Sequence, residues 1–153
     1  MPDIKLTHAF DMQVFVKTPI QNLGKTSHGT RLIAEVTGGE ISGPLLQGSI
    51  HAGGGDWLLT REDSVTQLDV RLTIEADDGG LIYCRYEGLR HGPADVMAKM
   101  AAGEPVDPSL FYFRVQPRFE TSAEPHLWMN RHLFIATGER NSQGPKYSIF
   151  KVE

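Results

Sequence analysis

The chain has 153 residues, of which 15 are Lys or Arg and 19 are Asp or Glu, for a formal net charge of −4. This length fits one domain whose core needs no disulfide or metal, so we expect a single barrel domain over residues 1–153. The acidic balance excludes nucleic acid as the main partner, because phosphate binding needs a basic face. The single cysteine, Cys84, leaves no internal disulfide and is expected to be a small buried side chain.

The start of the chain carries no basic segment followed by an apolar run, which a secretory signal would need. No stretch of the sequence is long and apolar enough to cross a bilayer. We therefore expect a cytoplasmic protein without a membrane partner.

Short apolar runs punctuated by Gly, Pro and Asp predict an all-β fold. In the first half of the chain, strands are predicted at residues 10–16, 32–36, 45–50 and 66–75, with a turn at residues 24–30. The residues after the glycine triplet at 53–55 also have a strand pattern. Asp77-Asp78-Gly79-Gly80 predicts a tight hairpin turn, because Asp-Gly tolerates the positive φ that such turns need. Residues 81–86 then return antiparallel.

One helix is predicted to interrupt the strands near residues 93–102. Pro93 favours a helix start, because its fixed φ suits the first turn, and Gly103 favours a stop. Val96, Met97 and Met100 share one helical face, which predicts packing against a core. Further strands at residues 110–119, 127–137 and 147–152 complete an antiparallel, lipocalin-like β-barrel.

The strand at residues 66–75 has two chemically distinct faces. One face is apolar and the other is polar: Leu68, Val70, Leu72 and Ile74 against Asp69, Arg71, Thr73 and Glu75. An ordinary barrel buries the apolar face, whereas a ligand-holding barrel lines its cavity with polar groups. The sequence alone leaves both arrangements open. We predict the second, in which one shared cavity is lined by Asp69, Arg71, Arg114, Glu120 and Asn130.

These charged residues indicate acid/base chemistry on a small-molecule ligand. Asp69 or Glu120 would move a proton, because burial raises the pKa of a carboxyl toward neutrality. Arg71 and Arg114 would stabilise developing negative charge. The residues predicted to bind the ligand are Asp56, Tyr83, Trp128 and Asn130. The alternative is a structural ion-pair network, since a buried charge must be paired.

The dipeptide Asp56-Trp57 is predicted to close one end of the barrel, with the ring of Trp57 buried against the core. The preceding glycines indicate a close approach of chains at a barrel rim. A phosphate loop is not predicted there, because the Lys and hydroxyl residue of such a loop are missing.

Neither a metal nor an organic cofactor is predicted. The six histidines form no His-x-His pair and no two-histidine helix motif. The sequence also has no dinucleotide fingerprint and no Gly-x-Ser-x-Gly elbow. The histidines are expected to be exposed or structural, with His132 predicted to share a face with Asn130.

A series of short motifs runs in order over nearly the whole chain. The motifs are Gly29-Thr30-Arg31, Thr37-Gly38-Gly39, Gly43-Pro44 with Gly48, Gly55-Asp56-Trp57, Leu68-Asp69-Val70-Arg71, Asp78-Gly79, Tyr83, Gly88 with Arg90-His91-Gly92-Pro93, Tyr112-Phe113-Arg114, Arg118-Phe119-Glu120-Thr121 and Trp128-Met129-Asn130-Arg131. The ordered set resembles domain-of-unknown-function family 3237, also called uncharacterised protein family 0311. The chain departs from the pattern at Met129, where Leu is more usual, and at His51-Ala52-Gly53, where Pro often precedes the glycines.

The resemblance implies a lipocalin-like barrel with a central cavity, and some relatives are linked to ring closure or hydration of small natural products. Two functions are compatible with the residues. One is a cofactor-free acid/base enzyme that cyclises, hydrates or isomerises an oxygenated hydrophobic substrate. The other is a carrier that binds a small ligand without chemistry. A third alternative is a homo-oligomer in which an apolar face meets a second copy.

Overall fold

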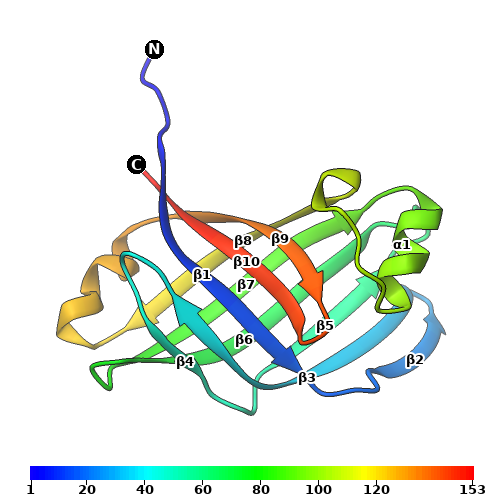
Figure 1. Ribbon diagram of the computed structural model, residues 1–153, viewed down its shortest axis with the longest axis horizontal. Helices are drawn as coiled ribbons and strands as arrows, with labels where there is room; N and C mark the ends of the chain where they lie inside the picture. Colours follow the sequence, from blue (N-terminus) through cyan, green and yellow to red (C-terminus); the bar gives the residue numbers. More distant parts are fainter.

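The computed structural model describes residues 1–153, and strands make up more than half of the chain (Figure 1). The elements in chain order are β1 (Leu6–Val16), β2 (Gln21–Thr26), β3 (Gly29–Ser42), β4 (Gly48–Ile50), β5 (Gly55–Thr60), β6 (Thr66–Ala76), β7 (Leu81–His91), α1 (Ala94–Ala101), η1 (Pro108–Leu110), β8 (Tyr112–Thr121), η2 (Glu124–Arg131), β9 (Phe134–Asn141) and β10 (Gly144–Val152). The segments η1 and η2 are 3-10 helices.

The strands form one sheet that closes on itself. Neighbours follow the order β1-β10-β9-β8-β7-β6-β4-β3, and β3 pairs back with β1. The short strands β4 and β5 lie one after the other between β3 and β6, so they share a single position in the barrel wall. The wall therefore has eight antiparallel positions. The predicted all-β antiparallel barrel with one short α-helix is confirmed.

Residue alternation along β6 decides which side of the wall faces inward. Leu68, Val70, Leu72 and Ile74 are each at most 3% exposed and belong to one core cluster of 29 buried residues. Because successive side chains of a strand point to opposite faces, the polar residues between them lie on the outside. The barrel thus follows the ordinary rule of apolar inside and polar outside along this strand.

The β6–β7 hairpin turns where the sequence predicts. Gly79 adopts φ +87°, and the Asp78 carboxylate accepts a hydrogen bond of 2.9 Å from the backbone N–H of Gly80. An Asx-type turn of this kind fixes the pairing of β6 with β7, in which Glu75 lies opposite Leu81.

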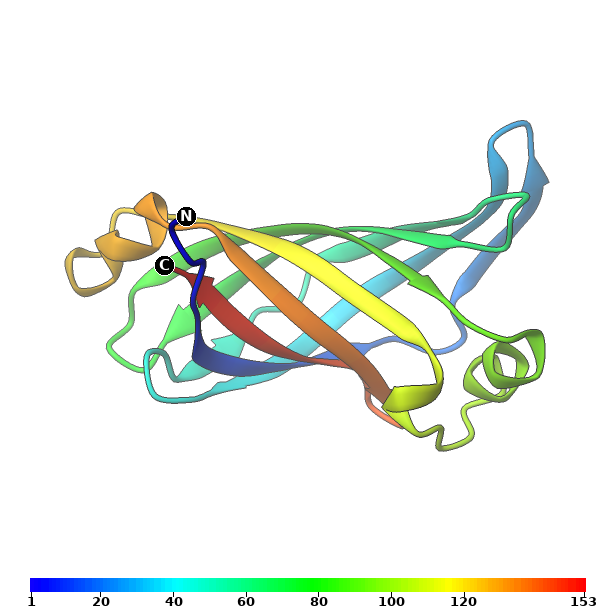
Figure 2. The ribbon, with the colours of Figure 1, turned by 90° about the horizontal axis from the view of Figure 1, so that it is seen from above.

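The two ends of the barrel carry different covers (Figure 2). The helix α1 and the β2–β3 hairpin lie at one end, which we call the α1 end. The segment η2 and both chain termini lie at the other end, which we call the η2 end. The helix α1 follows Pro93 and buries Val96 and Met100, as predicted. No helix of the structure is long and apolar enough to cross a membrane.

Three predicted elements differ from the observed ones. The strand predicted at residues 127–137 is a 3-10 helix through Arg131, and β9 begins only at Phe134. Pro125 occupies the first turn of that helix, where a missing N–H costs no hydrogen bond. The turn predicted at residues 24–30 instead spans the β2–β3 hairpin, and only residues 48–50 of the strand predicted at 45–50 pair with neighbours.

Candidate functional site

The cavity predicted from Asp69, Arg71, Arg114, Glu120 and Asn130 does not exist as one enclosed space. Arg71, Glu120 and Asn130 are exposed, and Asp69 and Arg114 are partly buried on the outer side of the barrel. The prediction of a shared cavity is wrong because the apolar residues that alternate with them take the interior. Their proposed catalytic and binding roles stay predictions.

The other predicted residues of this outer group are also spread out. Tyr83 lies opposite Glu120 across β7 and β8, and the residue is 40% exposed. Trp128 is partly buried in η2, where it packs against the ring of Phe134 at 5.9 Å between centroids. His132, predicted to share a face with Asn130, instead follows η2 and bonds its ring Nδ1 to the Trp128 carbonyl at 2.8 Å.

Asn130 has a structural contact that the sequence did not indicate. Its Oδ1 accepts a hydrogen bond of 2.8 Å from the Thr121 N–H, and its Nδ2 donates one of 2.8 Å to the Thr121 carbonyl. The side chain thereby pairs with the end of β8 as a strand neighbour would. This contact fastens η2 to the barrel wall.

Asp69 and Arg114 are brought together in a groove on the outside of the wall. The groove has a volume of about 490 Å³ and crosses β3, β5, β6, β7, β8 and β9. Its lining includes Trp57, Leu89 and Tyr112, and the Arg114 guanidinium lies 5.3 Å from the centre of the Tyr112 ring. We call this feature the outer groove.

Asp56 and Trp57 separate to opposite sides of β5. Asp56 is 7% exposed and faces the interior, whereas Trp57 is 42% exposed and lines the outer groove. The predicted burial of Trp57 is therefore wrong. Two consecutive strand residues cannot both point inward, and the carboxyl takes the inner position because Leu58 and Ala34 set the alternation around it.

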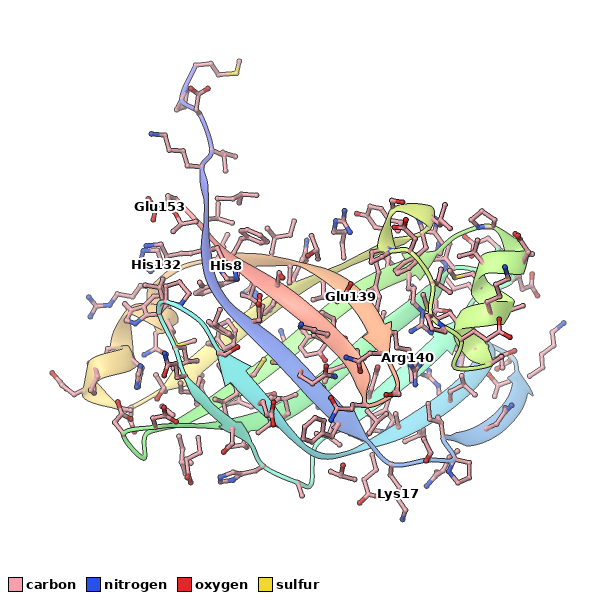
Figure 3. All side chains as sticks on the ribbon, in the orientation of Figure 1. His8, Lys17, His132, Glu139, Arg140 and Glu153 are labelled. Atoms are coloured by element: carbon pink, nitrogen blue, oxygen red, sulfur yellow. The ribbon has the colours of Figure 1, made fainter.

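Asp56 belongs to a polar cluster inside the α1 end of the barrel. It lines a cavity of about 20 Å³ together with Tyr86 of β7, Arg90 of β7 and Arg140 of β9. Figure 3 places Arg140 at the end of β9 that lies toward α1. The remaining lining is largely apolar and includes the partly exposed rim residues Val16, Ile20 and Pro145. We call these residues the interior site.

The interior site contains a carboxyl, that of Asp56, whose pKa is raised toward neutral pH by burial. Burial raises the pKa of Asp56 from 3.8 to about 6, while a hydrogen bond from the Asp69 N–H and the charge of Arg90 oppose the rise. That hydrogen bond is 3.1 Å long and ends on Oδ1 of Asp56. A carboxyl with a pKa close to neutral can both release and accept a proton under cellular conditions.

Both arginines of the interior site are free of carboxylate partners. The six ion pairs of the chain involve neither Arg90 nor Arg140. Burial lowers the pKa of Arg90, and the charge of Arg140 lowers it further. The guanidinium of Arg90 lies 5.5 Å from the centre of the Phe113 ring. Two unpaired guanidiniums beside one cavity favour an oxygen-bearing or anionic group in that cavity.

Tyr86, which lines the cavity, packs against Tyr147, which adjoins the interior site without lining its cavity. Tyr86 and Tyr147 contact each other edge to face, with ring centroids 5.0 Å apart, and both rings are at most 1% exposed. Burial raises the pKa of both hydroxyls, so both are neutral. The Tyr86 hydroxyl is close enough to act on the pKa of Tyr147, yet the geometry is not that of a hydrogen bond, and the Tyr147 hydroxyl has no partner.

Arg90, Arg140, Tyr86 and Tyr147 were not among the site residues predicted from the sequence. The alternation of residues along β7 could have indicated two of them, because Tyr86 and Arg90 lie on the same strand face as the apolar Ile82 and Cys84. A charged residue that continues an apolar face near the end of a strand indicates a polar group at a barrel mouth.

Histidine, cysteine and acidic side chains do not gather into a metal site. No group of three or more of them lies close enough to hold an ion. His126 instead bonds the Asp78 carboxylate at 2.7 Å and joins η2 to the β6–β7 turn. The Cys84 thiol is fully buried, and burial raises its pKa.

Comparison with known proteins places this arrangement in a family. The sequence profile of a family described as "Protein of unknown function (DUF3237)" matches residues 4–152. A "UPF0311 protein" of Rhodopseudomonas palustris is 36% identical over 133 residues, which cover 87% of each chain.

Two solved structures share the whole fold. A "conserved protein of unknown function" from Rhodopseudomonas palustris matches with a TM-score of 0.95 and 29% identity over 100% of both chains. A "beta-barrel like protein" from Acinetobacter baumannii matches with a TM-score of 0.87 and 33% identity, covering 100% of this chain and 98% of its own. The barrel, the ordered motifs and the match over residues 4–152 together show that the chain belongs to the DUF3237 family.

Proposed function

We propose that the chain binds a small, largely apolar, oxygenated molecule in the interior site and catalyses proton transfer on it. The observation that carries the proposal is Asp56, a buried carboxyl with a raised pKa that shares its cavity with two guanidiniums in no ion pair. A purely structural role would pair the buried Asp56 with one of the partly exposed guanidiniums, because a buried charge without a partner is costly.

The residues divide the proposed reaction between them. Asp56 takes a proton from the substrate or gives one to it, since its pKa of about 6 suits both directions. Arg90 and Arg140 stabilise the negative charge that develops on a substrate oxygen. The Tyr147 hydroxyl, which has no partner, donates a hydrogen bond to a second oxygen. Cyclisation, hydration and isomerisation each involve proton transfer and charge on oxygen, which such a set can support.

The apolar lining selects the rest of the substrate. A cavity of about 20 Å³ admits roughly one water molecule, so a larger ligand enters only when the rim moves aside. The rim residues Val16, Ile20 and Pro145 lie on connections and strand ends at the α1 end. Displacement of these apolar side chains widens the cavity and leaves the charged wall strands in place.

A distant structural neighbour supports the view that this barrel can carry catalysis. A protein described as "an enzyme from Penicillium herquei" matches with a TM-score of 0.72 and 18% identity over 99% of this chain. Likeness at that identity concerns the fold alone, so the residue roles above rest on the interior site of this chain.

The test separates an enzyme from a carrier. Small hydroxylated and unsaturated aromatic compounds are screened for binding by thermal shift, and those that bind are incubated with the protein in D₂O. We expect deuterium incorporation or product in NMR spectra. Asp56→Asn should lower the rate by about a hundredfold or more while the binding constant changes little.

Asp69→Asn is the matched control, because that side chain lies outside the barrel, and it should keep the rate. Binding without exchange or product for every compound would identify a carrier. Loss of the rate in Asp69→Asn but not in Asp56→Asn would place the chemistry in the outer groove.

A further inference from the structure

Three neighbouring strands carry charges on the outer face of the barrel that have no partner within the chain. Cross-strand register places Arg85 of β7 directly opposite Arg71 of β6 and Arg118 of β8. All three arginines are exposed, and none of the six ion pairs includes them. Like charges directly opposite on a sheet are destabilising, so this row calls for acidic groups from outside the chain.

The adjacent row on the same face supplies the opposite charge. Asp69 of β6 lies opposite Glu87 of β7, two residues along each strand from the arginines. Neither carboxylate forms an ion pair. The line between the acidic and the basic row runs through Val70, Tyr86 and Pro117, which are paired across the three strands.

On each of the three strands, an acidic and a basic residue lie at equal distances on opposite sides of that line. A second copy laid face to face and antiparallel, with the two-fold axis along the line, brings Glu87 onto the partner copy's arginine at position 85. It brings Asp69 onto the residue at position 71 in the same way. On β8 the residues equidistant from Pro117 are Arg114 and Glu120, which are again of opposite charge. The isologous dimer thus pairs opposite charges on each of the three strands, and Arg118 alone meets an uncharged residue, Gln116 of the other copy.

Apolar groups on β7 follow the same symmetry. Tyr83 and Leu89 are equidistant from Tyr86, and each is 40% exposed. Leu89 lies in the outer groove between Trp57 and Tyr112, whereas Tyr83 lies beyond the groove on the other side of the line. The two-fold axis therefore seats the Tyr83 ring of each copy over the outer groove of the other.

We infer that the outer face of β6, β7 and β8 is the interface of a homodimer. Burial of Tyr83 and Leu89 supplies the affinity, because exposed ion pairs contribute little by themselves. The ion pairs set the antiparallel orientation and exclude the parallel one, which would place arginine on arginine. This inference does not depend on the chemistry of the interior site.

Two opposite charge reversals on β7 test the interface, because each variant should disrupt the dimer alone and the two variants should pair when mixed. Arg85→Glu gives each copy two acidic groups at the self-paired positions, and Glu87→Arg gives each copy two basic groups. Each variant alone should sediment near the 17.0 kDa of one chain, whereas the wild type should sediment at twice that mass. An equimolar mixture of the two variants should recover the dimer, because the acidic copy then faces the basic copy.

The matched controls are Lys25→Glu and Glu40→Arg, which reverse exposed charges on β2 and β3. Both should sediment as the wild type does, and circular dichroism should show every variant folded. High salt should weaken the wild-type dimer. A monomeric wild type at millimolar concentration would overturn the inference. So would dimers that survive both reversals, or two monomeric variants that stay monomeric when mixed.

Discussion

The backbone N–H of Asp69 donates a hydrogen bond of 3.1 Å to the Oδ1 atom of Asp56. The two acidic residues lie on paired strands, yet their side chains point to opposite sides of the barrel wall. The bond gives the buried carboxyl of Asp56 one donor from the wall itself. It stabilises the ionised form without removing the cost of burial, which is why the pKa of Asp56 remains raised.

Asp56 makes the stability of the barrel depend on pH. The pKa of Asp56 in the folded chain, about 6, lies above its ordinary value of 3.8, so the folded chain holds a proton that the unfolded chain has lost. The stabilisation from that proton is fully present below pH about 4 and is lost as the pH rises through about 6. We expect a loss of about 3 kcal/mol at neutral pH.

Urea denaturation at a series of pH values measures this loss. Relative to Asp56→Asn, the wild type should lose free energy of unfolding over that interval, since Asn cannot ionise. The exposed Asp77→Asn should follow the wild type. A constant difference between the wild type and Asp56→Asn across the interval would contradict the raised pKa.

Trp57 and Leu58 provide a test of which side of β5 is the core. Trp57 is 42% exposed and Leu58 is 4% exposed. Leu58→Ala should cost about 2–5 kcal/mol of unfolding free energy, because it leaves a cavity in the interior. Trp57→Ala should cost roughly 1 kcal/mol despite the larger side chain removed. Chemical denaturation that ranks the two in the reverse order would show that the ring is buried.

Asn130 is expected to act on stability and not on the interior site. Asn130→Ala removes both hydrogen bonds to Thr121 and should cost about 1–2 kcal/mol. The control Gln116→Ala removes an exposed side chain on β8 and should change stability by about 0.5 kcal/mol or less. Ligand affinity, measured by calorimetry, should be the same in both variants. A loss of affinity in Asn130→Ala alone would show that Asn130 binds the ligand.

The Cys84 thiol takes no part in the proposed reaction. It is fully buried, and burial raises the pKa of the thiol, so a thiol-blocking reagent should react with it only after denaturation. Turnover should survive both that reagent and a chelator, since acid/base work by Asp56 needs neither group. Inactivation at the rate of thiol modification, or by the chelator, would point to a different mechanism.

Much of the barrel could be predicted from local pattern. The alternation of β6, the Asp-Gly turn and the helix after Pro93 depend on residues close in sequence, and all three form as expected. The prediction of a strand at residues 127–137 was wrong because Asn130 pairs with Thr121, nine residues earlier on β8, and holds η2 in place. This side-chain contact has no signature in the alternation of polar and apolar residues, although Pro125 in the first turn favours a helix start.

The candidate site was harder to predict because it depends on which face is inside. The polar face of β6 was assigned to a cavity, although its apolar face had the stronger demand for burial. Arg90 and Arg140 come from strands that are adjacent to neither each other nor β5, and only closure of the barrel brings them to Asp56. Of the four residues predicted from the sequence to bind the ligand, only Asp56 belongs to the interior site.

The most direct test of the proposed acid/base site is an NMR titration of the aspartate carboxyl carbons, with the Asp56 resonance assigned by its absence in Asp56→Asn. The midpoint for Asp56 should lie at about pH 6, because burial disfavours its ionised form. A midpoint near the ordinary value of 3.8 or below would show that the carboxyl is ionised throughout the neutral range, and would contradict a proton-transferring role for Asp56.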